Sequence, residues 1–151
     1  MTSHRRVQYA RSFKAVLLAL SVSNSVAFAL CTSPVNPDAT DPAIRGKVVG
    51  TWYSENPNPQ LGMVQRLYQT FSANGLFEYR DQTCGNIQGV PCSQNSGHGS
   101  WNAQRQADGW IYVRVQFSDL HRTNECTGWA AMFPDPNTMV MSNNSRAKRV
   151  Q

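Results

Sequence analysis

The clearest pattern along the chain is an alternation of apolar and polar residues with a period of two. It is most regular over residues 109–117, where every second side chain is apolar: Ile111, Val113, Val115 and Phe117. A period of two predicts a β-strand with one buried face and one face turned to water or ligand. Since the four apolar side chains make the drier core, we expect them to face inward and Arg114, between them, to face outward.

The same alternation predicts further strands over residues 47–54, 64–71 and 76–80, and, less regularly, over 97–104, 127–133 and 138–142. The stretch Ser72-Ala73-Asn74-Gly75 joins two of them, and Asn-Gly between apolar runs is typical of a tight hairpin. Short links and no strong amphipathic helix indicate an all-β meander. Closure into an up-and-down antiparallel β-barrel of about seven to eight strands removes the exposed edges, and a β-sandwich is the alternative.

A short motif, Gly50-Thr51-Trp52-Tyr53, opens the first of these strands. It resembles the G-x-W signature at the start of lipocalins and related calycin barrels, and avidin-type barrels begin with a similar G-T-W-Y. The resemblance covers these four residues and the overall length. It implies a lipocalin-like barrel in which Trp52 closes the floor beneath an arginine from beyond the last strand, a place that Arg146 would take.

The first 29 residues have the layout of a secretory signal peptide. Bases without acids precede an apolar run over residues 15–20, and Ala27-Phe28-Ala29 supplies the small-residue cleavage site. The run is too short for a membrane span. We therefore expect a secreted or periplasmic protein with four parts: a signal peptide (1–29), a flexible proline-containing arm (30–43), a β-barrel domain (44–143) and a basic tail (144–151).

The positive charge of the chain comes largely from this leader. Lys and Arg number fourteen against nine Asp and Glu, giving a net charge of +5, but four of the bases lie in the first 14 residues. Ten bases and nine acids remain, so the mature protein has no electrostatic footprint for nucleic acid.

Four cysteines remain after cleavage: Cys31, Cys84, Cys92 and Cys126. An even number in a small exported domain indicates two disulfides. We favour Cys84 with Cys92, because the stretch between them is rich in turn-forming residues, and Cys31 with Cys126. Lipidation of Cys31 is the competing interpretation, but Leu30 stands where a lipobox has a small residue.

Two functions fit such a barrel. The first is a binding protein that holds a small hydrophobic ligand inside, with candidate contacts drawn from the inner faces of the predicted strands: Trp52, Leu67, Phe71, Phe77 and Tyr79. The alternative is an inhibitor or effector with a filled barrel, whose loops 85–97 and 118–124 contact an extracellular protein. An interior cavity of at least roughly 300 Å³ would favour the ligand carrier.

Catalytic motifs are missing from the sequence. There is no nucleophile elbow, no H-E-x-x-H and no phosphate loop. His98 and His121 are the side chains that a lyase or isomerase would use, but both lie in turn-like surroundings. We expect no enzyme activity, no catalytic residues, no metal and no cofactor.

Overall fold

The structure is a computed structural model that describes residues 29–30, 33–85, 91–119 and 122–150. The expected signal peptide falls almost wholly outside these residues, and its cleavage stays a prediction. Within the described ranges, no helix is both long enough and apolar enough to cross a membrane.

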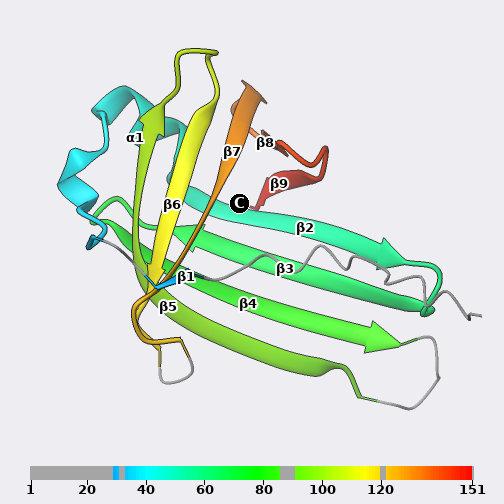
Figure 1. The fold of residues 1–151 in the computed structure, drawn as a ribbon. Coiled ribbons are helices and arrows are strands. Elements are labelled where there is room, and N and C mark those ends of the chain that lie inside the picture. Colours follow the sequence, from blue (N-terminus) through cyan, green and yellow to red (C-terminus); the bar gives the residue numbers. More distant parts are fainter. Residues whose placement is uncertain (1–28, 31–32, 86–90, 120–121, 151) are drawn as a thin grey trace, which may run out of the picture.

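The described chain is mostly β-strand, with one α-helix and one turn of 3-10 helix (Figure 1). The elements follow in this order: β1 (Ala29–Leu30), η1 (Pro37–Ala39), α1 (Pro42–Val48), β2 (Gly50–Asn58), β3 (Met63–Phe71), β4 (Leu76–Gly85), β5 (Ser93–Arg105), β6 (Ile111–Phe117), β7 (Glu125–Asp135), β8 (Thr138–Met141) and β9 (Arg146–Val150).

The strands β2 to β9 form the closed barrel that the alternation predicts. Each pairs antiparallel with its neighbour in sequence, and β9 returns to pair with β2. This is an eight-stranded up-and-down β-barrel, and β1 pairs with the first residues of β7, Glu125 and Cys126, before the stretch of β7 that pairs with β8. In Figure 1, β2 to β5 run side by side and reach beyond β6 and β7 on the side away from α1.

The inner face of β6 is the one expected. Its four apolar side chains are buried, while Arg114 lies outside and donates to the Ser33 carbonyl oxygen at 2.7 Å. A core at the α1 end of the barrel joins residues from every one of its strands, among them Trp52, Phe71, Phe77, Trp101, Ala103, Val113, Val115, Ala131, Met139 and Ala147. Because the sheet is closed, each strand buries its inward face in this one core.

The predicted hairpin between residues 64–71 and 76–80 is confirmed as β3 and β4. Gly75 takes a φ of +84°, a conformation that side chains with a Cβ disfavour, and its amide donates to the Ser72 carbonyl oxygen at 3.0 Å. A Cβ on Gly75 would collide with the ring of Pro37 in η1. The chain that precedes the barrel therefore packs against this hairpin turn.

The predicted strand over residues 47–54 is wrong in its first part, because α1 occupies Pro42–Val48. Asp41 caps this helix by accepting a hydrogen bond from the Ala43 amide at 2.7 Å, and Pro42 occupies its first turn. These start signals outweigh a short alternation in the residues that follow. The strand β2 begins at Gly50, whose φ of +136° allows the chain to turn out of the helix.

The arm preceding the barrel, expected to be flexible, is packed against it. Val35 and Thr40 are buried, and the Val35 amide donates to the side chain of Gln116 at 2.8 Å. The Thr40 hydroxyl accepts from the amide of Ala103 at the end of β5. Barrel side chains thus bond several backbone groups of this proline-containing segment, which belongs to no sheet: the Val35 amide and the carbonyl oxygens of Ser33 and Asn36.

The expected tail over 144–151 also differs, because β9 (Arg146–Val150) is the strand that closes the barrel. Its alternation is hidden in a basic sequence: Ala147 is fully buried, while Arg146 and Lys148 are exposed on either side of it. The aliphatic stems of Arg and Lys can lie along the barrel surface while their charged ends stay in water, so basic residues are compatible with this strand.

The arginine beside Trp52 is Arg149 rather than Arg146. Its guanidinium carbon lies 4.6 Å from the centre of the Trp52 ring, and it donates to the carbonyl oxygens of Val49 and Lys47 at 2.8 Å each. Trp52 itself donates from Nε1 to the Val48 carbonyl oxygen at 2.8 Å. Three carbonyls at the end of α1 are therefore satisfied from the barrel floor.

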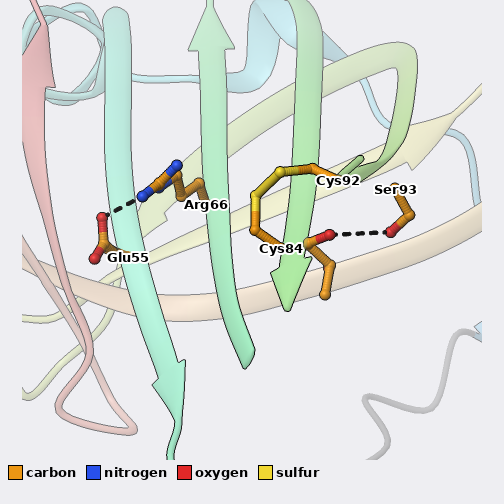
Figure 2. Close-up of a disulfide and its surroundings, with 6 residues drawn as sticks. Glu55, Arg66, Cys84, Cys92 and Ser93 are labelled. Carbon is orange, nitrogen blue, oxygen red and sulfur yellow. Dashed lines mark hydrogen bonds and ion pairs between the residues drawn. A yellow bond between two sulfur atoms is a disulfide. The ribbon is translucent and has the colours of Figure 1, made fainter. Parts of the chain in front are cut away.

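The expected disulfide between Cys84 and Cys92 is present and joins the end of β4 to the segment entering β5 (Figure 2). Cys126 is also disulfide-bonded. Its expected partner, Cys31, lies outside the described residues.

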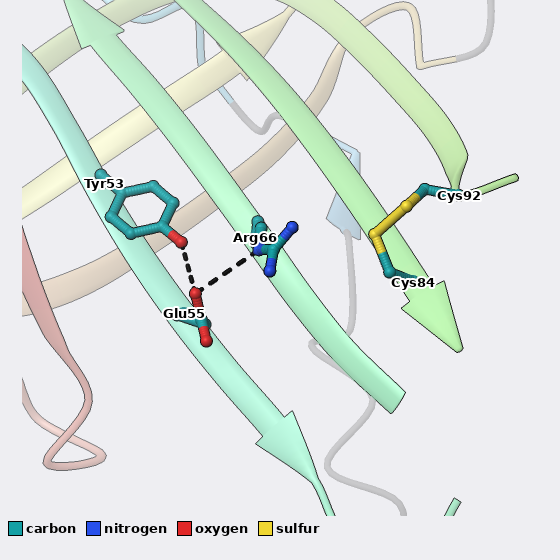
Figure 3. Close-up of polar contacts among 5 residues, drawn as sticks. All are labelled: Tyr53, Glu55, Arg66, Cys84 and Cys92. Carbon is teal, nitrogen blue, oxygen red and sulfur yellow. Dashed lines mark hydrogen bonds and ion pairs between the residues drawn. A yellow bond between two sulfur atoms is a disulfide. The ribbon is translucent and has the colours of Figure 1, made fainter. Parts of the chain in front are cut away.

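A polar cluster lies on the outer face of β2 and β3, close to this disulfide (Figure 3). Glu55 accepts a hydrogen bond from the Tyr53 hydroxyl at 2.5 Å and lies 3.5 Å from Arg66. The hydrogen bond from Tyr53 is the main reason that the pKa of Glu55 is lowered, and it raises the pKa of Tyr53 in return.

Candidate functional site

The barrel interior is solid at the α1 end and open at the other. The open part is a cavity of about 360 Å³. Its walls come from the six strands β3 to β8 and from the segments that follow β6 and β8. The lining residues are Gln65, Leu67, Gln69, Phe77, Tyr79, Asp81, Asn95, Phe117, Arg122, Thr127, Gly128, Trp129, Met141 and Asn143.

Three of the five predicted ligand contacts line this cavity. Leu67, Phe77 and Tyr79 face it from β3 and β4. Trp52 and Phe71 do not, because they lie in the packed floor, 0% and 1% exposed. Both are part of the buried core, where the ring centres of Phe71 and Phe77 are 5.1 Å apart. Their role in this structure is to close the barrel beneath the cavity.

The apolar part of the cavity is aromatic. The rings of Phe77, Tyr79 and Phe117 are in mutual contact, with centres 5.8 to 6.2 Å apart, and Trp129 completes the wall from β7. Such rings present large rigid faces to an apolar ligand.

Glycines in β5 create the space for these rings. Gly97 pairs with Tyr79 across the sheet, and a Cβ at Gly97 would collide with the Tyr79 ring and with Asp119. At Gly99 a Cβ would collide with the backbone of Gln116. The sequence Gly97-His98-Gly99 therefore serves packing: His98, between the two glycines, is exposed.

Polar side chains line the cavity nearer the disulfide. Asp81, paired with Leu67 and Asn95 on its neighbouring strands, lies two residues beyond Tyr79 along β4. Gln65 donates from Nε2 to Asp81 Oδ2 at 2.7 Å. The other oxygen of the carboxylate, Oδ1, is buried without a hydrogen-bond partner anywhere in the described chain.

Trp129 contributes a second polar atom of this kind. Its indole Nε1 is buried and has no acceptor among the residues that the structure describes. Buried donors and acceptors are nearly always satisfied, and an orphan costs free energy on the order of 1 to 3 kcal/mol. An acceptor beside Trp129 and a donor beside Asp81 would both be stabilising.

Arg122 lines one side of the cavity and was missed by sequence reasoning, which considered residues 118–124 only as a loop that could contact another protein. Its guanidinium carbon lies 4.1 Å from the centre of the Phe117 ring and 4.4 Å from that of Tyr79. Asp119 lies 3.9 Å away and accepts a hydrogen bond from the Arg122 amide at 2.9 Å. Burial lowers the pKa of Arg122. No signal in residues 118–124 separates this arginine from an ordinary loop base, because its partners come from two different strands.

A second hollow, of about 640 Å³, lies over the outer face of β2 to β5 and is lined mainly by polar side chains such as Thr70, Glu78, Arg80 and His98. It is wide open to solvent and has no buried orphan atom from those four residues. Across the described ranges, no three His, Cys, Asp or Glu side chains are grouped to hold a metal ion. His121 lies outside these ranges.

No protein-family model, curated protein or solved structure matches this chain. The cavity is the feature of the described chain that bears on its function. A cavity with aromatic walls and a few polar side chains in its lining is suited to holding a small, largely apolar molecule.

Proposed function

We propose that this chain is an exported, disulfide-bridged, lipocalin-like binding protein that holds one small, largely apolar ligand in the open half of its barrel, acting by binding and not by catalysis. The observation that carries the proposal is the cavity of about 360 Å³ between the aromatic walls. Sites for small ligands commonly start at about this size.

The two orphan atoms support a ligand over an empty chamber. Apolar cavities without polar atoms stay dry and empty in many proteins, but Asp81 and Trp129, which line this one, each have a buried polar atom without a partner in the described chain. The alternative, a protein-interaction module, requires a barrel filled by side chains, and the open half of this barrel disfavours that alternative. Export is supported by the leader-like first 29 residues and by the Cys84–Cys92 disulfide.

Calorimetric titration with N-phenyl-1-naphthylamine, a neutral apolar probe, tests the proposal. Leu67→Trp should fill part of the cavity and weaken binding at least about tenfold, since a displaced ligand loses its apolar contacts. Tyr68→Trp is the matched control: it is the next residue along β3, and its side chain lies on the outer face, beside Tyr53. Saturable binding that is weakened by the first variant and kept by the second supports the proposal. No binding to the wild type, or equal binding by both variants, refutes it.

A further inference from the structure

The charge that the cavity offers to a ligand is concentrated at Asp81. Its carboxylate is held in one orientation by the hydrogen bond from Gln65 at 2.7 Å, and Oδ1 is the oxygen left for another donor. Neither of the ion pairs formed within the described chain includes Asp81. A carboxylate oxygen that is buried without a donor is costly, and a charged donor relieves it more than a neutral one.

The other charged group in the lining, Arg122, is already engaged. Asp119 offsets its charge at 3.9 Å, and its guanidinium lies against the rings of Tyr79 and Phe117. The remaining bases near β4 point away: Arg80, next to Asp81 in the chain, lies over the Tyr68 ring on the outer face. With Arg122 and Asp119 offsetting each other, the net charge facing the cavity is that of Asp81.

Aromatic side chains line a large part of the cavity on the side of Asp81 that faces the barrel floor. Tyr79 lies two residues from Asp81 along β4, which corresponds to roughly 7 Å of strand. The aromatic faces attract cations as well as apolar groups. A ligand whose apolar part contacts Phe77 and Trp129 would therefore place a terminal polar group beside Asp81.

We propose that the ligand is a small organic amine, with an apolar or aromatic body among the aromatic side chains and a protonated nitrogen that donates to Asp81 Oδ1. This inference rests on the proposed function, because it names the chemical class that the same cavity selects. A neutral hydrophobic molecule or a carboxylic acid would leave the Asp81 oxygen without a charged donor.

Three probes that share one aromatic body test the head group separately: 2-(2-naphthyl)ethylamine, neutral 2-ethylnaphthalene and anionic 3-(2-naphthyl)propionate. Calorimetric titration of the purified protein at pH 7 should show the amine binding at least about tenfold more tightly than the neutral probe, as expected for a hydrogen bond between charged groups. The propionate should bind most weakly.

Asp81→Asn keeps the size of the side chain and an oxygen that can accept from Gln65, so the fold should be retained. It should reduce the affinity for the amine about tenfold and leave that for the neutral probe unchanged. Glu78→Gln, an exposed acid on the same strand outside the cavity, is the matched control and should change neither.

The outcomes separate the two proposals. Binding of the neutral probe without a preference for the amine, tighter binding of the propionate, or an Asp81→Asn variant that keeps full amine affinity overturns the amine class while the barrel remains a ligand carrier. Failure of all three probes to bind refutes the proposed function, and this inference with it.

Discussion

Arg149 links the last strand of the barrel to the helix that precedes the first, and replacing it with methionine should destabilise the protein. The guanidinium donates two hydrogen bonds of 2.8 Å to backbone carbonyls and stacks on Trp52 at 4.6 Å. Methionine keeps much of the apolar stem but none of these three interactions.

The size of the effect follows from those contacts. Hydrogen bonds from a charged donor contribute about 1 kcal/mol each after discounting for the partial exposure of the side chain. A cation–π contact adds about 0.5 to 1 kcal/mol. The expected loss is about 2 to 3 kcal/mol in the free energy of unfolding, or roughly 10 °C in Tm for a domain of this size.

Thermal melting followed by circular dichroism at pH 7 measures this loss. Arg146→Met, on the same strand but exposed, is the matched control and should shift Tm by no more than about 2 °C. Arg149→Lys should fall between the two, since a lysine retains the charge without the two-pronged geometry. Equal melting temperatures for Arg149→Met and Arg146→Met would refute the conclusion that the contacts of Arg149 stabilise the closed end of the barrel.

Two further predictions concern the hairpin turns and the outer face. Gly75→Ala should lower the free energy of unfolding by about 1 kcal/mol more than Gly109→Ala in urea denaturation, because both glycines have φ near +85° but only Gly75 is seated against Pro37; equal losses would contradict this packing. Tyr53→Phe should raise the pKa of Glu55 towards its ordinary value, measured by NMR titration. A carboxyl whose pKa is lowered by folding stabilises above its unfolded pKa of about 4.3 and loses that effect as the pH falls through its folded pKa, so this variant should show a weaker fall in Tm below about pH 4.5 than the wild type. An unchanged Glu55 pKa would be evidence against the Tyr53 hydrogen bond.

The barrel could be predicted because its evidence is local. The alternation over 109–117 sets which face of β6 is buried, and the Asn74-Gly75 turn forces two successive strands to pair. Neighbouring strands joined in this way can only close on themselves or leave two open edges. The Cys84–Cys92 disulfide was predictable for the same reason, since it spans a short turn-rich stretch.

What escaped prediction depends on contacts between distant segments. The strand β9 is recognisable only once Ala147 is seen to face the core, and Arg149 is separated by about a hundred residues from the carbonyls it contacts. Asp81 and Arg122 gain their places in the cavity from partners on other strands. Within the sequence, each looks like an ordinary surface charge.

The distribution of indole side chains gives the protein a built-in optical reporter. Trp52 and Trp101 are sealed in the floor, at 0% and 1% exposed, and Trp110 does not line the chamber. Trp129 does, and its indole N–H is buried without an acceptor among the described residues. Tryptophan fluorescence should therefore change on ligand binding chiefly through Trp129. Trp129→Phe should abolish that change, while the fluorescence of Trp52 and Trp101 continues to report the folded state.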